Sequence, residues 1–157
     1  MSIIQAWFTA ESIRFRTRAL RALFRDQRAE LLAIWRHLQP GDIACDIGAN
    51  KGSFIYWLSW WVHDGRVFAF EPQPELARGL RNICDVIGLG NVTVEAKAVH
   101  LRAGEQQLYV PVGHQPSASL IRRDATDDVV ELSVPVVSLD DYFSESDKVA
   151  LLKIDVE

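Results

Sequence analysis

The sequence of 157 residues predicts a doubly wound α/β fold, in which helices pack on both faces of a mainly parallel sheet. Three observations support this prediction. Short apolar runs alternate with helical patterns between residues 43 and 99, and a turn with two glycines follows the first run. A nearly continuous apolar run, typical of a strand in a parallel sheet, occupies residues 149–154. Right-handed crossovers would bring the carboxyl ends of these strands to one edge, where such sheets bind ligands.

The elements of the first half follow from apolar periodicity. Residues 43–47 (IACDI) and 66–70 (RVFAF) are short, mainly apolar runs, and both are predicted to be strands. Between them, residues 53–62 (SFIYWLSWWV) are expected to form a helix that is apolar on most sides and therefore packs on the sheet. Its tryptophans have helical spacing, which favours core packing over an aromatic platform for a sugar. They are Trp57, Trp60 and Trp61.

The second half begins with a predicted helix over residues 74–87, whose first residue is a proline at a position where a missing N–H costs nothing. Gly88 suits its C-terminal cap. Residues 91–99 (NVTVEAKAV) alternate as one strand, the third of the predicted sheet. Residues 104–137 hold two β-like stretches around a polar loop, which predicts a β insertion before the last strand. Ser138 can begin a short helix that leads to that strand.

An N-terminal helical arm is expected over residues 1–38, before a domain that occupies residues 39–157. Residues 1–40 hold seven arginines and three acidic residues, a net charge of +4, whereas the remainder carries −8. Apolar residues recur in the arm at helical spacing, which predicts one buried face with the arginines on the solvated side. The residues of this face are Leu20, Phe24, Leu31, Trp35 and Leu38. The alternative is that the basic arm attracts nucleic acid or anionic lipid.

Composition excludes several classes of protein. Apolar residues make up 48% and charged residues 24% of the sequence, and no apolar run approaches the ~20 residues that span a bilayer. A nucleic-acid-binding module would more often be basic overall, whereas the net charge is −4, so no nucleic-acid partner is expected. Two cysteines and no signal-peptide pattern predict a cytoplasmic protein without disulfides. Cys45 is expected in the core and Cys84 on a helix surface.

The most informative segment is the turn over residues 46–52 (DIGANKG), which lies between a predicted strand and a predicted helix. Gly48 and Gly52 let the backbone turn sharply and approach a ligand, and the N–H groups at the following helix start can bind a carboxylate. The segment lacks the G-x-G-x-x-G pattern of dinucleotide sites and the Lys-Ser/Thr pair of a phosphate-binding loop. Asp46 would oppose a pyrophosphate but suits a ligand with an ammonium group.

A second polar position follows the second predicted strand. Glu71 lies 19 residues after Gly52, where a strand-end carboxylate can accept hydrogen bonds from both hydroxyls of a ribose. This spacing is shared by sites for NAD and for S-adenosylmethionine, so it does not separate the two cofactors. Together with the turn of residues 46–52, it predicts a site for a ligand that carries a ribose.

These segments resemble the FkbM-type methyltransferases, a family that uses S-adenosylmethionine and mostly methylates hydroxyl groups. The resemblance rests on the runs DIGANKG, RVFAFEPQPE, PVVSLDDYF and LLKIDVE, and it covers residues 38–157. It implies the Rossmann-like sheet of class I methyltransferases, with seven strands in the order 3-2-1-4-5-7-6. This sequence would supply the N-terminal part of that sheet, strands 3-2-1-4.

The resemblance also implies roles for individual residues. The loop of residues 46–52 would hold the methionine end of S-adenosylmethionine, with its first residue near the amino group. Glu71 would hold the ribose, and Val99 would flank the adenine. Asp155 and Glu157 would face the methyl group and the acceptor. The cofactor-binding residues implied in this way are Asp46, Gly48, Asn50, Gly52, Glu71 and Val99.

Methyl transfer to a hydroxyl is an in-line displacement, in which the cofactor supplies the reactivity and the protein aligns acceptor oxygen, methyl carbon and sulfur at about 3 Å. A neutral hydroxyl is a poor nucleophile, so a general base assists it. Asp155 is the first candidate, because a strand-end carboxylate reaches the crevice, and Glu157 lies on the same side of an extended chain. His100 and His114 are further candidates. No cluster of metal ligands is visible, so no metal is assigned.

The leading function is therefore O-methylation of a hydroxyl on a small metabolite, polyketide or sugar. One alternative, an NAD-dependent oxidoreductase, is disfavoured by the missing third glycine and by Asp46. The other alternative is a non-catalytic fragment or interaction module. It is supported by the end of the sequence, which leaves the apolar strand of residues 149–154 at the edge of the expected sheet. Such an edge invites pairing with another chain, so we expect a truncated, self-associating and inactive chain.

Overall fold

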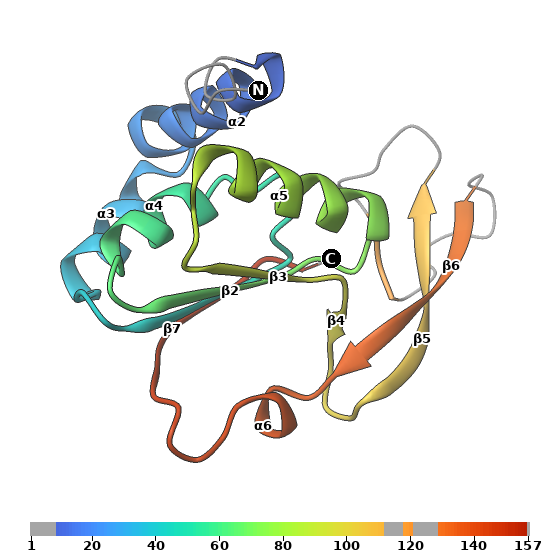
Figure 1. Cartoon of the computed structure of the whole chain (residues 1–157). Helices are drawn as coiled ribbons and strands as arrows, with labels where there is room; N and C mark the ends of the chain where they lie inside the picture. The colour runs from blue at the N-terminus through green and yellow to red at the C-terminus, as the bar shows by residue number, and fades with distance from the viewer. Residues whose placement is uncertain (1–8, 112–117, 121–128, 157) are drawn as a thin grey trace.

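The computed structural model describes residues 9–111, 118–120 and 129–156, and Figure 1 shows its main sheet at the centre. All four strands of this sheet are parallel, in the order β3-β2-β1-β7, which confirms the predicted order 3-2-1-4 and the α/β class. The strands are β1 (Ile43–Ile47), β2 (Arg66–Phe70), β3 (Val92–Glu95) and β7 (Val149–Ile154). The first two strands have the bounds that apolar periodicity predicts.

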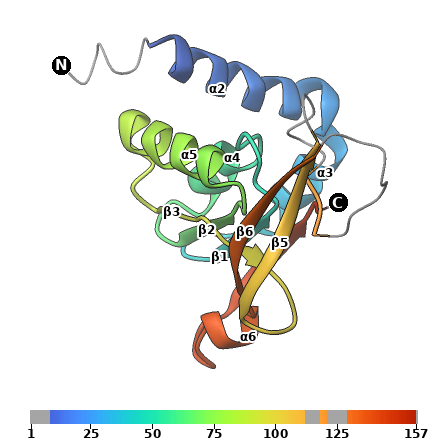
Figure 2. The same cartoon turned by 90° about the vertical axis from the view of Figure 1, so that its right-hand side faces the viewer.

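The helices cover one face of the main sheet in two tiers (Figures 1 and 2). Directly on the sheet lie α4 (Ile55–Trp61) and α5 (Pro74–Ile87), the latter ending at Gly88 in the left-handed conformation, as predicted. Above them lie the first two elements of the arm, α2 (Ala10–Arg21) and a π-helical turn η1 (Ala22–Asp26). The last helix of the arm, α3 (Arg28–His37), lies beside α4, where its Leu31 packs in the core with Ala44 and Val67 of the sheet. The opposite face is covered by the short helix α6 (Leu139–Tyr142) and by a second sheet.

The second sheet is the β insertion predicted between the third and fourth strands of the main sheet. Its order is β4-β6-β5, and its strands are β4 (Ala98–Val99), β5 (Gly104–Pro111) and β6 (Val129–Val137). The prediction of one strand over residues 91–99 is wrong, because the chain leaves the main sheet after Glu95. Ala98 then pairs with β6 and buries its side chain against Leu108 and Val134. The alternating segment therefore contributes one strand to the main sheet and a second strand to the other sheet.

The two cysteines are both buried. Cys45 lies in the core, as predicted, but the expected surface position of Cys84 is wrong, since its side chain is also buried. Cys84 shares the inner face of α5 with Leu80 and Ile87, at the spacing that brings side chains together on a helix. Burial raises the pKa of both thiols to about 12, so both are protonated at neutral pH.

The predicted apolar face of the arm is only partly buried. Leu31 and Leu38 are in the core, whereas Leu20, Phe24 and Trp35 are 45%, 70% and 54% exposed. The prediction fails because the inner face of α2 is made by a different set of residues, and because η1 inserts a π-helical turn that shifts the helical phase. The residues that α2 and η1 bury are Ser12, Phe15, Ala19 and Ala22.

The tryptophans of α4 tie this helix to the arm. The indole of Trp57 donates a hydrogen bond to the carbonyl of Ala19 at 2.7 Å, and its ring stacks on that of Trp61. Both rings are half-buried against the core, as helical spacing predicts. Trp60 differs from this prediction, since it is 57% exposed on the outer side of the helix.

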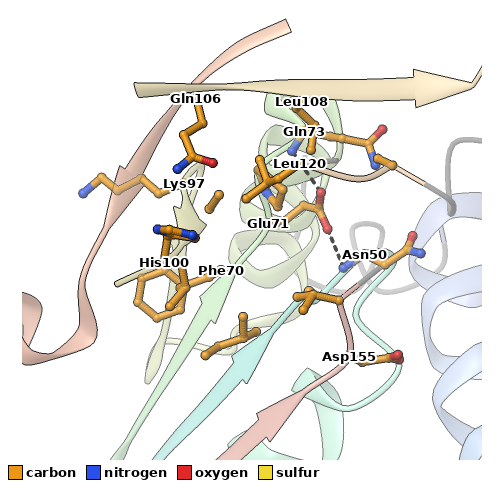
Figure 3. A pocket seen from close by; sticks show the side chains of 17 residues that line it. Asn50, Phe70, Glu71, Gln73, Lys97, His100, Gln106, Leu108, Leu120 and Asp155 are labelled. Carbon is orange, nitrogen blue, oxygen red and sulfur yellow. Dashed lines mark hydrogen bonds between the residues drawn. The ribbon is translucent and has the colours of Figure 1, made fainter. Parts of the chain in front are cut away.

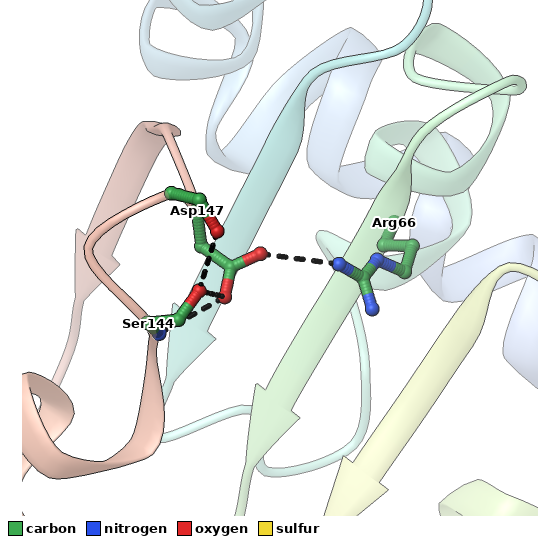
Figure 4. A network of polar contacts seen from close by, with 4 residues as sticks. Arg66, Ser144 and Asp147 are labelled. Atoms are coloured by element: carbon green, nitrogen blue, oxygen red, sulfur yellow. Dashed lines mark hydrogen bonds and ion pairs between the residues drawn. The ribbon is translucent and has the colours of Figure 1, made fainter.

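A polar network fixes the connection that leads to β7 (Figure 4). The carboxylate of Asp147 accepts hydrogen bonds from the backbone N–H and the hydroxyl of Ser144, at 3.0 and 2.8 Å, and it pairs with Arg66 at 3.3 Å. The bonds from Ser144, followed by the charge of Arg66, lower the pKa of Asp147. Because Arg66 begins β2, the network attaches the approach to β7 to the main sheet.

Within the described residues β7 is an edge strand with β1 as its neighbour, as the sequence predicts. Its apolar side chains are largely in solvent, with Leu152 45% and Ile154 59% exposed, whereas Lys153 is buried. Among the helices of residues 9–111 and 129–156, none is both long and apolar enough to cross a membrane.

Candidate active site

A pocket of about 580 Å³ opens where the carboxyl ends of β1 and β2 meet the second sheet (Figure 3). Its walls come from four parts of the chain. The first two are the turn after β1 and the segment that follows β2. The third is the second sheet with the residues next to it, and the fourth is Asp155 and Val156 after β7. This is the edge at which doubly wound sheets bind ligands, as the order of strands predicts.

The turn after β1 is shaped by close backbone contacts. Gly48 has a positive φ of 77°, and a Cβ at this position would collide with the carbonyl oxygen of Asp155. The N–H groups of Gly48 and Ala49 donate to the carbonyl of Phe70, which binds the turn to the end of β2. Asn50 also has a positive φ, 47°, a conformation that asparagine tolerates. Its side-chain oxygen is buried and has no hydrogen-bond partner among the described residues.

Glu71 is the most strongly anchored acid of the pocket. It is 3% exposed, and its two carboxylate oxygens accept the backbone N–H groups of Asn50 at 2.8 Å and Gln73 at 2.9 Å. Burial raises the pKa of Glu71, although these two hydrogen bonds oppose the rise. The carboxylate is therefore held in one orientation by the turn after β1 and by the start of α5.

The wall opposite Glu71 belongs to the second sheet. Val99 and His100 line it from β4 and the residue that follows, and Leu108 and Gln106 line it from β5. Figure 3 shows the amide of Gln106 directed from β5 toward His100. Within the described part of the chain, the amide of Gln106 has no hydrogen-bond partner. Apart from the amide, the imidazole and Lys97 at its margin, this wall is apolar, so it suits a flat, partly polar ring.

Lys97 lies where β3 gives way to β4 and belongs to a small polar network at the pocket margin. Its ammonium pairs with Glu95 at 2.9 Å, and the hydroxyl of Tyr142 donates to the other oxygen of Glu95 at 2.9 Å. Burial and the carboxylate of Glu95 together raise the pKa of Tyr142 to about 12. Although burial acts in the opposite direction, Lys97 and Tyr142 lower the pKa of Glu95. The network fixes the turn that redirects the chain into the second sheet.

A buried ion pair lies beneath the pocket. The ammonium of Lys153 is 2.9 Å from Asp46 Oδ1, and the two side chains are 7% and 1% exposed. Lys153 also stands over the ring of Phe54 at 4.8 Å. Burial raises the pKa of Asp46, and the charge of Lys153 opposes this rise. Asp46 therefore has a cation of the chain itself as its partner, and it is absent from the pocket lining.

Asp155 follows directly on β7 and lines the pocket on the side of Asn50 (Figure 3). Its side chain is 68% exposed, and its carboxylate is 3.6 Å from the ammonium of Lys153. Its backbone N–H donates to the carbonyl of Ile47 at 3.0 Å, which extends the pairing of β7 with β1 by one residue. The backbone of Asp155 is thus positioned by the strand, and its carboxylate is largely in solvent at the margin of the pocket.

The pocket brings together most of the residues singled out in the sequence. Its lining contains Gly48, Asn50, Glu71, Val99, Asp155 and His100. Contact of these residues with a cofactor or substrate stays a prediction. Asp46 and Gly52 do not line it, and a Cβ at Gly52 would instead collide with Phe15 and Leu80. Glu157 and His114 lie outside the described residues.

Sequence reasoning missed Gln106 as a pocket residue. The signal was present in the alternation of β5, in which Leu108 and Val110 are buried and Gln106 shares their face. Nothing in the sequence alone shows which sheet this face meets. Metal ligation finds no support in the described residues, where no three His, Cys, Asp or Glu side chains lie close enough together to hold an ion.

Comparison with known proteins assigns the family. The sequence pattern of the methyltransferase FkbM domain matches residues 46–157, whereas no curated protein matches. A solved structure of a mutant of MtNAS in complex with S-adenosylmethionine has 20% identity and a TM-score of 0.41, over 61% of this chain and 37% of that one. Methyltransferase FkbM from Methylobacillus flagellatus KT has 14% identity and a TM-score of 0.42, over 92% and 37%.

This chain thus spans little more than a third of the length of both solved proteins. The family match, in contrast, takes in most of the chain, from the last residues of β1 to the end of the sequence. It includes the turn of Gly48 and Asn50, the anchored Glu71, the second sheet and Asp155, which are the parts that build the pocket. The chain therefore belongs to the methyltransferase FkbM domain family.

Proposed function

We propose that the pocket binds S-adenosylmethionine and that the protein transfers its methyl group to a hydroxyl of a small molecule. The observation that carries this proposal is the Glu71 carboxylate, which two backbone N–H groups hold at the end of β2. A fixed, buried carboxylate has lone pairs left to accept both hydroxyls of a ribose. Gly48, on the neighbouring strand end, provides the close backbone approach that the adjoining part of the ligand needs.

The groups along the pocket match the successive parts of an extended S-adenosylmethionine molecule. Asn50, Glu71 and Gln106 follow one another across the pocket (Figure 3). The unpartnered oxygen of Asn50 suits the ammonium of the methionine end, and Glu71 suits the ribose. The apolar wall with Leu108 suits the faces of a purine.

Asp155 is the residue that we assign to the acceptor. When bound, the cofactor supplies a methyl group on a positively charged sulfur, which is the electrophile. Asp155 lies on the Asn50 side of the pocket, where the methionine end would be, and its carboxylate is accessible. It can therefore take the proton of an acceptor hydroxyl as the oxygen attacks. The pairing of its N–H with Ile47 keeps the carboxylate next to the loop of Gly48.

Titration with S-adenosylhomocysteine by calorimetry tests the cofactor assignment, with NAD as the competing ligand. We expect saturable binding of S-adenosylhomocysteine and none of NAD. Failure of S-adenosylhomocysteine to bind, or equal binding of NAD, would contradict the proposal. Methyl transfer is then assayed with labelled S-adenosylmethionine against a set of hydroxylated sugars, phenols and polyketides.

Replacement of Asp155 by asparagine is expected to lower turnover on an accepted substrate by about 10²-fold or more, because a general base typically contributes that much. Affinity for S-adenosylhomocysteine should change little, since the side chain faces the acceptor. Asp141→Asn, at an exposed position of α6, is the matched control and should retain full activity. Unchanged turnover in the Asp155 variant would remove this residue from the mechanism.

We place the amide of Gln106 at the edge of the adenine ring, where it would make two hydrogen bonds. Replacement of Gln106 by leucine is therefore expected to weaken binding of S-adenosylhomocysteine at least about 5-fold, since each neutral hydrogen bond contributes roughly 0.5–1.5 kcal/mol. On both hydrogen-bonding edges of adenine, an amide that makes two bonds must accept one of them from the 6-amino group. An analogue of S-adenosylhomocysteine that lacks this amino group should therefore bind more weakly than S-adenosylhomocysteine to the unmodified chain. In the Gln106→Leu variant the two ligands should bind equally well. Gln107→Leu changes the exposed neighbour on the opposite face of β5 and should bind like the unmodified chain.

A further inference from the structure

Helix α2 and the turn η1 carry a second apolar face, which points away from the domain. Ile13, Leu20 and Phe24 are 47%, 45% and 70% exposed, and their spacing places them along one side of the helix. We call these three residues the outer stripe. Figure 2 shows α2 along the margin of the molecule, with its inner side toward α4 and α5. Surface helices usually have one apolar stripe, so a second one in solvent calls for a partner.

The outer stripe cannot be buried by rotation of α2, because the inner face is firmly held. Phe15 and Ala19 lie in the core, and Ala19 accepts the indole hydrogen bond of Trp57. Arg18 donates to the carbonyl of Lys51 at 2.7 Å, which attaches the same helix to the turn before α4. The outward direction of the stripe is thus a fixed property of the fold.

Arginines flank the outer stripe on the surface of the arm. The exposed ones are Arg14, Arg21, Arg25 and Arg28. Few acids oppose them, since α2 contains only Glu11, α3 contains only Glu30, and the carboxylate of Asp26 pairs with Arg25 at 2.8 Å. The arm is therefore strongly basic while the rest of the chain is acidic, and the positive charge gathers around apolar side chains. The arm thus combines arginines, which attract anions, with apolar side chains whose burial is favourable.

We propose that the outer stripe and its arginines bind the surface of an anionic lipid bilayer. Helices that lie in a membrane interface combine these features, with Phe or Leu entering the boundary of the acyl chains and arginines beside the phosphates. Nucleic acid would engage the arginines but leave Phe24 and Leu20 in water. The inference is independent of the proposed methyl transfer, because none of these residues lines the pocket.

Co-sedimentation of this chain with lipid vesicles tests the proposal. We expect binding to vesicles of phosphatidylcholine with phosphatidylglycerol, little binding to phosphatidylcholine alone, and release at about 1 M salt, where surface charges are screened. The double variant Leu20→Ser/Phe24→Ser should bind at least about tenfold more weakly, with an unchanged far-ultraviolet dichroism spectrum. The matched control, Leu101→Ser/Val130→Ser, removes two exposed apolar side chains outside the arm and should bind normally.

Several results would overturn the proposal. The first is equal binding to both kinds of vesicle, or none to either. The second is undiminished binding of the variant in the outer stripe. Self-association that the Leu20→Ser/Phe24→Ser change abolishes would show that a second copy covers the stripe. Binding to a short DNA duplex that this change leaves intact, in the absence of vesicle binding, would assign the arginines to nucleic acid.

Discussion

Replacement of Lys153 by methionine is expected to lower the free energy of unfolding by about 3–5 kcal/mol, as is typical when one partner of a buried ion pair is removed. Methionine approximately fills the space of the lysine stem and retains contact with Phe54. What it removes is the ammonium, 2.9 Å from an Asp46 carboxylate that is 1% exposed. The carboxylate would then be a buried charge with no cation. Chemical denaturation monitored by tryptophan fluorescence measures the loss.

The double variant Asp46→Asn/Lys153→Met separates the cost of the uncompensated charge from the cost of lost packing. Because it removes both charges, it should recover a large part of the stability lost in the single variant. Lys148→Met, at an exposed position before β7, is the matched control and should change stability by no more than about 0.5 kcal/mol. A single variant as stable as Lys148→Met would show that the pair contributes nothing.

The loss should also depend on pH. Burial raises the pKa of Asp46 in the folded chain, so the folded state binds a proton more readily than the unfolded state does. Stability from this group therefore falls as pH rises from the unfolded to the folded pKa. Without Lys153 the pKa of Asp46 in the folded chain rises further. The loss of unfolding free energy in Lys153→Met should therefore be largest above this raised pKa, and it should become smaller on acidification. A deficit independent of pH would assign the effect to packing alone.

The main sheet could be predicted from the sequence because its signals are local. Residues 43–47 and 66–70 are short apolar runs bounded by turns, and their order follows from the crossover rules. Residues 91–99 were harder, since alternation reports that a segment is extended but not which sheet it joins. The predicted apolar face of the arm was wrong for a related reason, because α2 buries a different set of residues and η1 then changes the helical phase, which leaves Leu20 and Phe24 in solvent. Both errors arise from tertiary contacts.

The candidate site was predictable to the same extent. Gly48, Asn50 and Glu71 follow strands directly, so their convergence is a property of a parallel sheet. Gln106 enters the pocket only because the second sheet folds back over the first, and the alternation of β5 indicates which face Gln106 shares but not what that face meets. Asp46 shows the opposite case, since its position in the motif suggests ligand contact whereas its nearest cation is Lys153. Local pattern thus finds strand-end residues more reliably than it finds their partners.

Glu71→Gln is expected to weaken binding of S-adenosylhomocysteine about 10- to 100-fold, because a hydrogen bond to a charged group contributes roughly 1.5–3 kcal/mol. The change also places an amide NH₂ against one of the N–H groups of Asn50 or Gln73, which now donate to carboxylate oxygens. The orientation of the remaining acceptor is then lost as well. Calorimetric titration measures the affinity, and thermal unfolding without ligand measures any loss of stability. Glu75→Gln, exposed in the first turn of α5, is the matched control.

The pH dependence of binding distinguishes a ribose contact from a structural role for Glu71. Burial raises the pKa of this carboxyl, so acidification should protonate it above the ordinary range of a glutamate and weaken ligand binding. In Glu71→Gln the residue no longer titrates, and this part of the pH dependence should disappear. A structural role alone would lower the stability of the variant but leave its affinity, measured on the folded protein, unchanged. That result would show that Glu71 does not bind a ribose, and the proposed cofactor would lose the observation on which it depends.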